Sequence, residues 1–210
     1  SFGANLTLAK ILSFTERNIA KIIIGQYLGY TQVGLYSLGN MIVIKPVKSV
    51  SQFVNPVFYS LVSRKKEMIK ENLASNFLTY IQVCVLFFYP AGIILMFFSE
   101  DIILLILGNK WEGMISIVFI FSFLLFIRPI TKINVEIFKA LSLTGVILKI
   151  NMVFTILYVV VIFYSVQFGL EQVAISYVIV NYMLSFVSAG YIMKKLNVSL
   201  FKIFKNIKNI

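Results

Sequence analysis

The 210-residue sequence contains no histidine, one cysteine and only eight acidic residues. The absence of histidine excludes histidine-based metal sites and histidine acid–base chemistry. The single cysteine, Cys84, lies in the apolar run "YIQVCVLFFYP" and cannot form a disulfide bond within the chain. The sequence also lacks a glycine-rich phosphate loop, a paired-carboxylate site and a nucleophile–base arrangement. We therefore predict that the protein is not an enzyme and binds neither a cofactor nor a metal.

Hydrophobic residues, in contrast, make up 60% of the chain, and the mean hydropathy is +0.93. Soluble domains contain roughly 45–50% apolar residues. An excess of this size along the whole length predicts an all-α, polytopic membrane protein. No signal peptide is visible and the first residue is Ser1 rather than methionine, so we expect the chain to start partway through a longer protein.

Six apolar segments are long enough for the roughly 20 residues that a membrane span needs. They lie at about 4–25, 33–62, 76–98, 114–141, 148–168 and 172–193. We predict a six-helix transmembrane lobe over residues 1–193 and a basic amphipathic tail over residues 194–210 that lies on the membrane surface. Gly29 and Gly34 bracket the first predicted loop. The third loop is long enough for a short interfacial helix, with Trp111 at the level of the lipid headgroups.

Positive charges are distributed unevenly between the predicted loops. The second loop, the flanks of the fourth and the tail contain Arg64, Lys65, Lys66, Lys70, Lys139, Lys149, Lys194, Lys195, Lys202, Lys205 and Lys208. The other three loops contain one cation, Lys110, beside four acidic residues. Because lysine and arginine are enriched in cytoplasmic loops, we predict that both termini are cytoplasmic. The net charge of +11 therefore indicates contact with membrane lipids rather than with nucleic acid.

Three of the predicted spans also contain charged residues in regular spacing, which places them on one face of each helix. The first span contains Arg17 and Lys21, and the second has a polar stripe that includes Lys45 and Lys48. The stripe of the second span continues through Gln52 and Asn55. The charged residues of the fourth span are Arg128, Lys132, Glu136 and Lys139. Pro46 and Pro56 interrupt the second span and Pro129 the fourth, so we predict kinks there.

A lysine or arginine in the middle of a membrane costs about 2.5–3.5 kcal/mol on insertion scales. Glu136 can offset Lys132 or Lys139 within its own helix, but the acidic residues inside the spans are too few to neutralise all the cations. These side chains could extend to the membrane surface or bond carbonyl groups of neighbouring helices. For Arg17, Lys45, Lys48 and Arg128, near mid-depth, we favour a hydrated cationic cavity that receives an anionic ligand.

Three stretches of the sequence resemble a known family. "IIIGQYLGYTQVGLYSLGNMIVIKPVKSVSQFVNPVFYSLVSRKKE" at 22–67, "LLILGNKWEGMISIVFIFS" at 104–122 and "FKALSLTGVILKINM" at 138–152 follow one another as in the Wzx-type polysaccharide flippases of O-antigen and capsule assembly. These belong to the multidrug/oligosaccharidyl-lipid/polysaccharide exporter superfamily. The chain departs from the family in having a single lobe instead of two.

The resemblance implies the second lobe of an exporter in the inner membrane of a bacterium. Its cargo would be an undecaprenyl-pyrophosphate-linked oligosaccharide, and its partner the missing N-terminal lobe or a second copy. The residues expected to line the substrate cavity are Arg17, Lys21, Lys45, Lys48, Gln52, Asn55, Arg128 and Lys132. Two alternatives stay open. A cation-coupled drug exporter of the same superfamily would need Glu16 or Glu136 as its ion site, and a non-transporting membrane fragment would move nothing.

Overall fold

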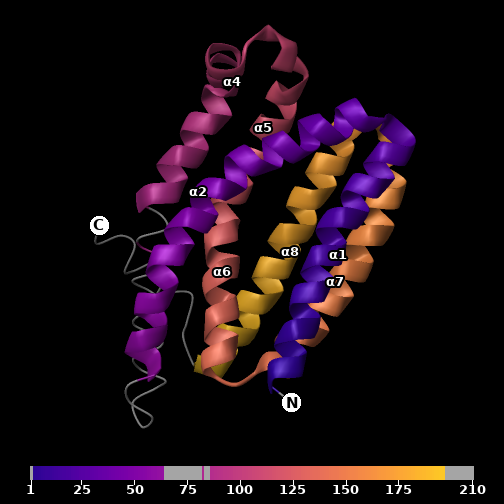
Figure 1. The fold of residues 1–210 in the computed structure, drawn as a ribbon. Helices are drawn as coiled ribbons and strands as arrows, with labels where there is room; N and C mark the ends of the chain where they lie inside the picture. Colours follow the sequence, from indigo (N-terminus) through magenta and orange to yellow (C-terminus); the bar gives the residue numbers. More distant parts are fainter. Residues whose placement is uncertain (1, 64–81, 83–85, 197–210) are drawn as a thin grey trace.

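The computed structural model describes residues 2–63, 82 and 86–196, and within them all regular secondary structure is helical (Figure 1). The elements are α1 (Phe2–Leu28), α2 (Tyr30–Ser63), a helix over Leu86–Phe97, α4 (Ser99–Leu107), η1 (Asn109–Met114), α5 (Ile115–Ser122), α6 (Leu124–Ala140), α7 (Thr144–Ser165), η2 (Val166–Phe168) and α8 (Leu170–Leu196). The predicted all-α class is confirmed. The second predicted loop and most of the predicted tail lie outside the described residues.

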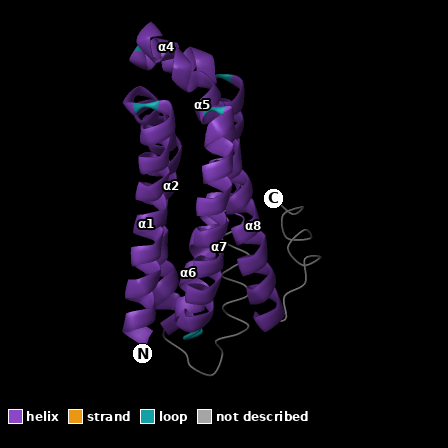
Figure 2. Ribbon diagram, turned by 90° about the vertical axis from the view of Figure 1, so that its right-hand side faces the viewer, coloured by secondary structure: helices purple, strands orange, loops and turns teal. Residues whose placement is uncertain are grey.

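The long helices run back and forth between the two ends of an elongated bundle (Figures 1 and 2). The N-terminus and the α6–α7 connection lie at one end, and the α1–α2 connection, α4 and the α7–α8 connection lie at the other. Lys139 in the last turn of α6 and Lys194 in the last turn of α8 belong to helix ends on the same side of the bundle as the N-terminus.

Two of the described helices are long and apolar enough to cross a membrane: Thr144–Phe168, which includes η2, and Leu170–Lys195. The number rises to four if each of two bent pairs is counted as one span. These pairs are Leu86–Phe97 with α4 and Asn109–Ser122 with α6. The helices α1 and α2 are not among these candidates because charged and polar residues recur along them. The described part of this membrane protein is therefore all-helical and contains two to four candidate spans.

The predicted span at 114–141 is divided by a bend of 50° between α5 and α6. The bend lies at Phe123, six positions before Pro129, so the proline is not the point at which the helix breaks. The Ser122 hydroxyl donates to the Phe119 carbonyl at 2.6 Å, a side-chain bond that often bends helices. The Tyr182 hydroxyl of α8 donates to the Phe123 carbonyl at 2.9 Å and so satisfies a backbone group at the bend.

The first predicted loop is shorter than the sequence indicated. Only Gly29 separates α1 from α2, and its φ of +89° is a conformation that glycine adopts without strain. The prediction that Gly34 closes this loop is wrong, because α2 begins at Tyr30 and Gly34 lies in its second turn. Pro46 does not end α2 either, although Figure 1 shows that this helix changes direction along its length. A proline removes one helical hydrogen bond, which makes such a bend easier.

The core joins helices that are distant in sequence. An aromatic cluster forms where α2, α5, α7 and α8 meet, and we define it as Tyr36, Phe121, Tyr158 and Tyr177. Its ring centroids lie 5.3–6.3 Å apart, in the range for favourable aromatic pairs. The hydroxyl groups of Tyr36 and Tyr158 are 3.1 Å apart and form a hydrogen bond. Gly92 allows the helix Leu86–Phe97 to approach α6, since a Cβ at this position would lie 2.8 Å from the Phe126 ring.

Candidate functional site: cationic side chains on α1, α2 and α6

The two lysines of the polar stripe of α2 lie on the face that is turned away from the core of the bundle. Val43 and Val47 are 0% and 1% exposed, whereas Lys45 and Lys48 between and beside them are exposed. At 3.6 residues per turn the two lysines share a face that is largely opposite the two valines. Among the described residues, neither lysine has a hydrogen-bond or ion-pair partner. The two ammonium groups therefore lie on the outside of the described bundle.

Arg128 of α6 is arranged differently. Its guanidinium Nη2 donates to the Tyr177 hydroxyl of α8, and its Cζ lies 5.2 Å from the centroid of the same ring. The contact combines a hydrogen bond with a cation–π interaction. The Arg128 Nε is buried and has no hydrogen-bond partner among the described residues. Arg128 thus points into the bundle and joins α6 to the aromatic cluster.

The other predicted site residues fall into two groups. Lys21 of α1 and Lys132 of α6 are exposed, and α2 packs against both of these helices. The side chains of Arg17, Gln52 and Asn55 lie outside the described residues. The exposed cations Lys21, Lys45, Lys48 and Lys132 therefore come from three helices, with α2 in contact with the other two.

Glu136 pairs with Lys139, one of the two partners that its spacing predicted. Its Oε1 accepts a hydrogen bond from Lys139 Nζ at 2.8 Å, in an i,i+3 pair on α6. Both side chains are partly buried. The Lys139 charge is thus balanced within its own helix, unlike the charges of Lys45 and Lys48.

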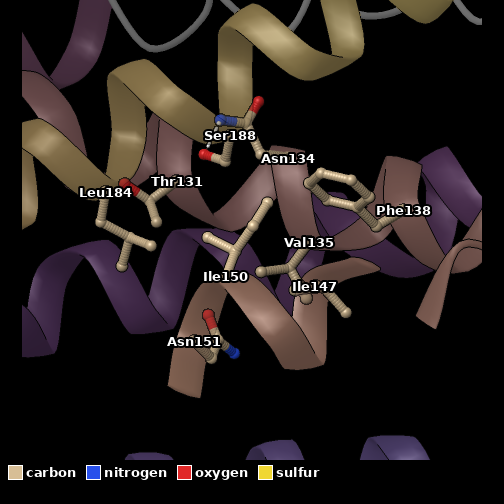
Figure 3. Close-up of a pocket in the computed structure, with 9 residues that line it drawn as sticks. All are labelled: Thr131, Asn134, Val135, Phe138, Ile147, Ile150, Asn151, Leu184 and Ser188. Carbon is tan, nitrogen blue, oxygen red and sulfur yellow. Dashed lines mark hydrogen bonds between the residues drawn. The ribbon is translucent and has the colours of Figure 1, made fainter. Parts of the chain in front are cut away.

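A small cavity lies between α6, α7 and α8 (Figure 3). It is lined by Thr131, Asn134, Val135, Phe138, Ile147, Ile150, Asn151, Leu184 and Ser188. Its volume of about 20 Å³ has room for one water molecule. Asn134 Nδ2 donates to Ser188 Oγ at 2.9 Å, and the Asn134 Oδ1 is buried without a partner among the described residues. The cavity is too small for a phosphate-containing substrate, and its lining includes none of the predicted cations.

Neither Tyr177 nor Asn134 was predicted as a site residue from the sequence. Tyr177 is 49 positions from Arg128, and no local spacing connects the two residues. Asn134 lies two positions after Lys132 on α6 but is 1% exposed, so it belongs to the buried face of this helix. A helical wheel of residues 124–140 could have separated Asn134 from the charged positions. The Tyr177 contact required the tertiary structure.

Comparison with known proteins identifies the family. The family model described as "Polysaccharide biosynthesis protein" matches residues 1–116, which is more than half of the chain. The chain belongs to this polysaccharide biosynthesis protein family. The matched range includes α1 and α2, and with them Lys21, Lys45 and Lys48.

Curated relatives of this polysaccharide biosynthesis protein agree with the family match. The teichuronic acid biosynthesis protein TuaB of Bacillus subtilis (strain 168) is 27% identical over 95% of this chain and 42% of its own length. An uncharacterized membrane protein in the cps region of Klebsiella pneumoniae is 24% identical over 88% of this chain and 39% of its own. The lipopolysaccharide biosynthesis protein WzxC of Escherichia coli (strain K12) is 22% identical over 75% of this chain and 32% of its own length.

The chain therefore spans less than half the length of each of these relatives. No solved structure matches it.

Proposed function

We propose that this chain is one six-span lobe of a flippase that moves an undecaprenyl-pyrophosphate-linked oligosaccharide across the bacterial inner membrane. The observation that carries the proposal is the exposed pair Lys45 and Lys48 on α2, a helix of the family-matched range. The relatives' printed roles in teichuronic acid and lipopolysaccharide biosynthesis support the substrate class. The export of the lipid-linked sugar serves the assembly of a surface polysaccharide.

Lys45 and Lys48 are costly to place in contact with lipid. Each charge at mid-membrane costs about 2.5–3.5 kcal/mol, so the pair costs roughly 5–7 kcal/mol in contact with lipid. The bundle offers the pair no carboxylate among the described residues. A hydrated cavity lowers this cost, and a pyrophosphate supplies negative charge and acceptor oxygens for charge-assisted hydrogen bonds. Lys21, Lys132 and Arg17 add positive charge from α1 and α6.

The position of the stripe also implies what must complete the site. Lys45 and Lys48 lie on the outside of this bundle, so a cavity forms only when a second lobe covers α2. That lobe is the N-terminal part of a longer protein or a second copy of the chain. Rocking of the two lobes would expose the cavity first to the cytoplasm and then to the outer side. The proline-containing helix α2 would bend during this movement, with Gln52 and Asn55 further along the same cavity wall.

Arg128 contributes to the site mainly by position. Its contact with Tyr177 holds α6 against α8 and so supports the surface on which Lys132 and α2 lie. For the drug-exporter alternative, Glu136 is already paired with Lys139, and the side chain of Glu16 lies outside the described residues. A coupling cation would have to displace that lysine.

The decisive experiment replaces Lys45 and Lys48 together by alanine in the longest reading frame that contains this chain. The variant is expressed in a bacterial host whose own copy has been deleted. We expect surface polysaccharide to fall more than about tenfold, because both charges that would bind the pyrophosphate are removed. Lipid-linked oligosaccharide should accumulate in the inner membrane, which separates failed flipping from failed synthesis.

The matched controls are Lys149→Ala, which removes an exposed lysine from α7, and the double variant Lys45→Arg/Lys48→Arg, which keeps both charges. Export should be unchanged in Lys149→Ala and largely kept in the arginine variant. Normal export by the double alanine variant, at a normal level of protein in the membrane, would refute the proposal. Equal loss in Lys149→Ala would show that any lost lysine impairs the protein.

A further inference from the structure

The helix α4 turns sharply away from the helix that precedes it. The axes of Leu86–Phe97 and α4 differ by 80°, with the break at Phe98. If the helix Leu86–Phe97 runs along the membrane normal, α4 lies close to the membrane plane. Figure 1 shows α4 at the end of the bundle opposite the N-terminus, where the long helices turn.

The surface of α4 is divided into three arcs. At 3.6 residues per turn, Ser99 and Ile103 share one arc, and both are buried. Ile103 packs with Met114 and Val118 of the neighbouring elements. This arc attaches α4 to the rest of the protein and leaves two other arcs exposed.

The two exposed arcs differ in chemistry. Leu105 and Ile106 are 85% and 73% exposed, and Ile102 lies between them on the same arc. Glu100 is exposed on the side opposite Ile102, and Asp101 is exposed at the edge of the apolar arc, one helical turn before Leu105. A helix in water would gain nothing from an exposed leucine–isoleucine surface. A helix in the middle of a membrane would bury two carboxylates at high cost.

We propose that α4 lies in a membrane–water interface, with Ile102, Leu105 and Ile106 in the acyl-chain boundary and Glu100 and Asp101 in water. The occupant of the apolar arc is therefore the lipid bilayer. Helices of this kind insert an apolar face about 5–10 Å deep. Phe97, the last residue of the preceding helix, and Phe98, at the break, are also exposed. The proposal is independent of the proposed transport function.

The residues that follow α4 are also of the types found at the membrane–water interface. Lys110 Nζ lies 5.5 Å from the centroid of the Trp111 ring, just after the end of α4. Tryptophan rings are enriched at the headgroup level, and a neighbouring lysine can contact lipid phosphates from there. An opposing protein lobe would be a poorer match for this surface, because it would have to cover the apolar arc while leaving two adjacent carboxylates in water.

Fluorescence provides a direct test, because Trp111 is the only tryptophan of the chain. The full-length protein, with tryptophans outside this chain replaced by phenylalanine, is reconstituted into phosphatidylethanolamine–phosphatidylglycerol vesicles. Lipids brominated at shallow or deep positions then quench the fluorescence from the membrane side, and iodide quenches it from water. Trp111 should be quenched most by the shallow lipid probe.

Three single-tryptophan variants in a Trp111→Phe background show which positions contact lipid and which contact water. Leu105→Trp should be quenched by brominated lipid at least about twofold more strongly than Glu100→Trp, and iodide should show the reverse order. Ile156→Trp, on the exposed face of the candidate span of α7, is the control for a deep position. Equal iodide quenching of the Leu105 and Glu100 positions would overturn the proposal. Protection of Leu105→Trp from both quenchers would overturn it as well, because another protein surface would then cover the arc.

Discussion

The cations of α2 and of α6 differ in what the protein provides for them. Lys45 and Lys48 are exposed and have no partner among the described residues, whereas Arg128 contacts Tyr177 and Lys139 pairs with Glu136. All four interrupt apolar segments of the sequence. The comparison teaches that a positive charge in an apolar helix does not by itself mark a ligand site. The informative property is whether the fold already supplies the partner.

The largest effect on stability is expected when the partner of Arg128 is removed. Tyr177→Ala deletes a buried ring of the aromatic cluster and leaves the guanidinium without its cation–π contact. We expect the free energy of unfolding to fall by about 3–5 kcal/mol. Chemical denaturation in detergent micelles would measure the loss. The double variant Lys45→Ala/Lys48→Ala is the contrast and should change stability by less than about 0.5 kcal/mol. Similar losses in both proteins would remove the distinction between the two kinds of cation.

A smaller effect on stability is expected when residue 128 keeps a positive charge but loses the planar guanidinium group. Arg128→Lys retains a cation but not the planar guanidinium, which stacks on a ring and donates in a fixed geometry. We expect a loss of about 1–2 kcal/mol, measured in the same denaturation assay. Lys45→Arg should be neutral for stability, because the exposed lysine has no fixed geometry to keep. A stable Arg128→Lys variant would mean that the charge alone, and not the Tyr177 contact, holds α6 in place.

The smallest effect is expected at the pair on α6. Glu136→Gln removes the charge that balances Lys139, in an i,i+3 pair that is partly exposed. Such pairs contribute about 0.2–0.5 kcal/mol, so unfolding should change little. Polysaccharide export should persist in this variant. If export instead stopped, and if the protein also lost an efflux of cationic drugs, Glu136 would be a coupling site and the drug-exporter alternative would gain support.

Much of the fold could be predicted because helix formation in a membrane follows local rules. Long apolar segments predicted α7 and α8, and Gly29 predicted the turn between α1 and α2, where its positive φ is found. The i,i+3 spacing of Lys45 and Lys48 predicted a shared face, and both are exposed on α2. The bend at Phe123 was missed, since it depends on a hydroxyl–carbonyl bond and on a tyrosine from α8. The count of six spans and the cavity residues remain predictions.

The sequence alone determined the class of this protein, the alternation of its helices between two ends and the family to which it belongs, because these depend on composition, periodicity and local motifs. Only the tertiary structure separated Arg128 from Lys45 and Lys48. The direction of a side chain into or away from a bundle depends on which helix packs beside it, and Tyr177 comes to Arg128 from 49 positions further along the chain. The three arcs of α4 likewise became distinct only when Ile103 was seen to pack against Met114 and Val118.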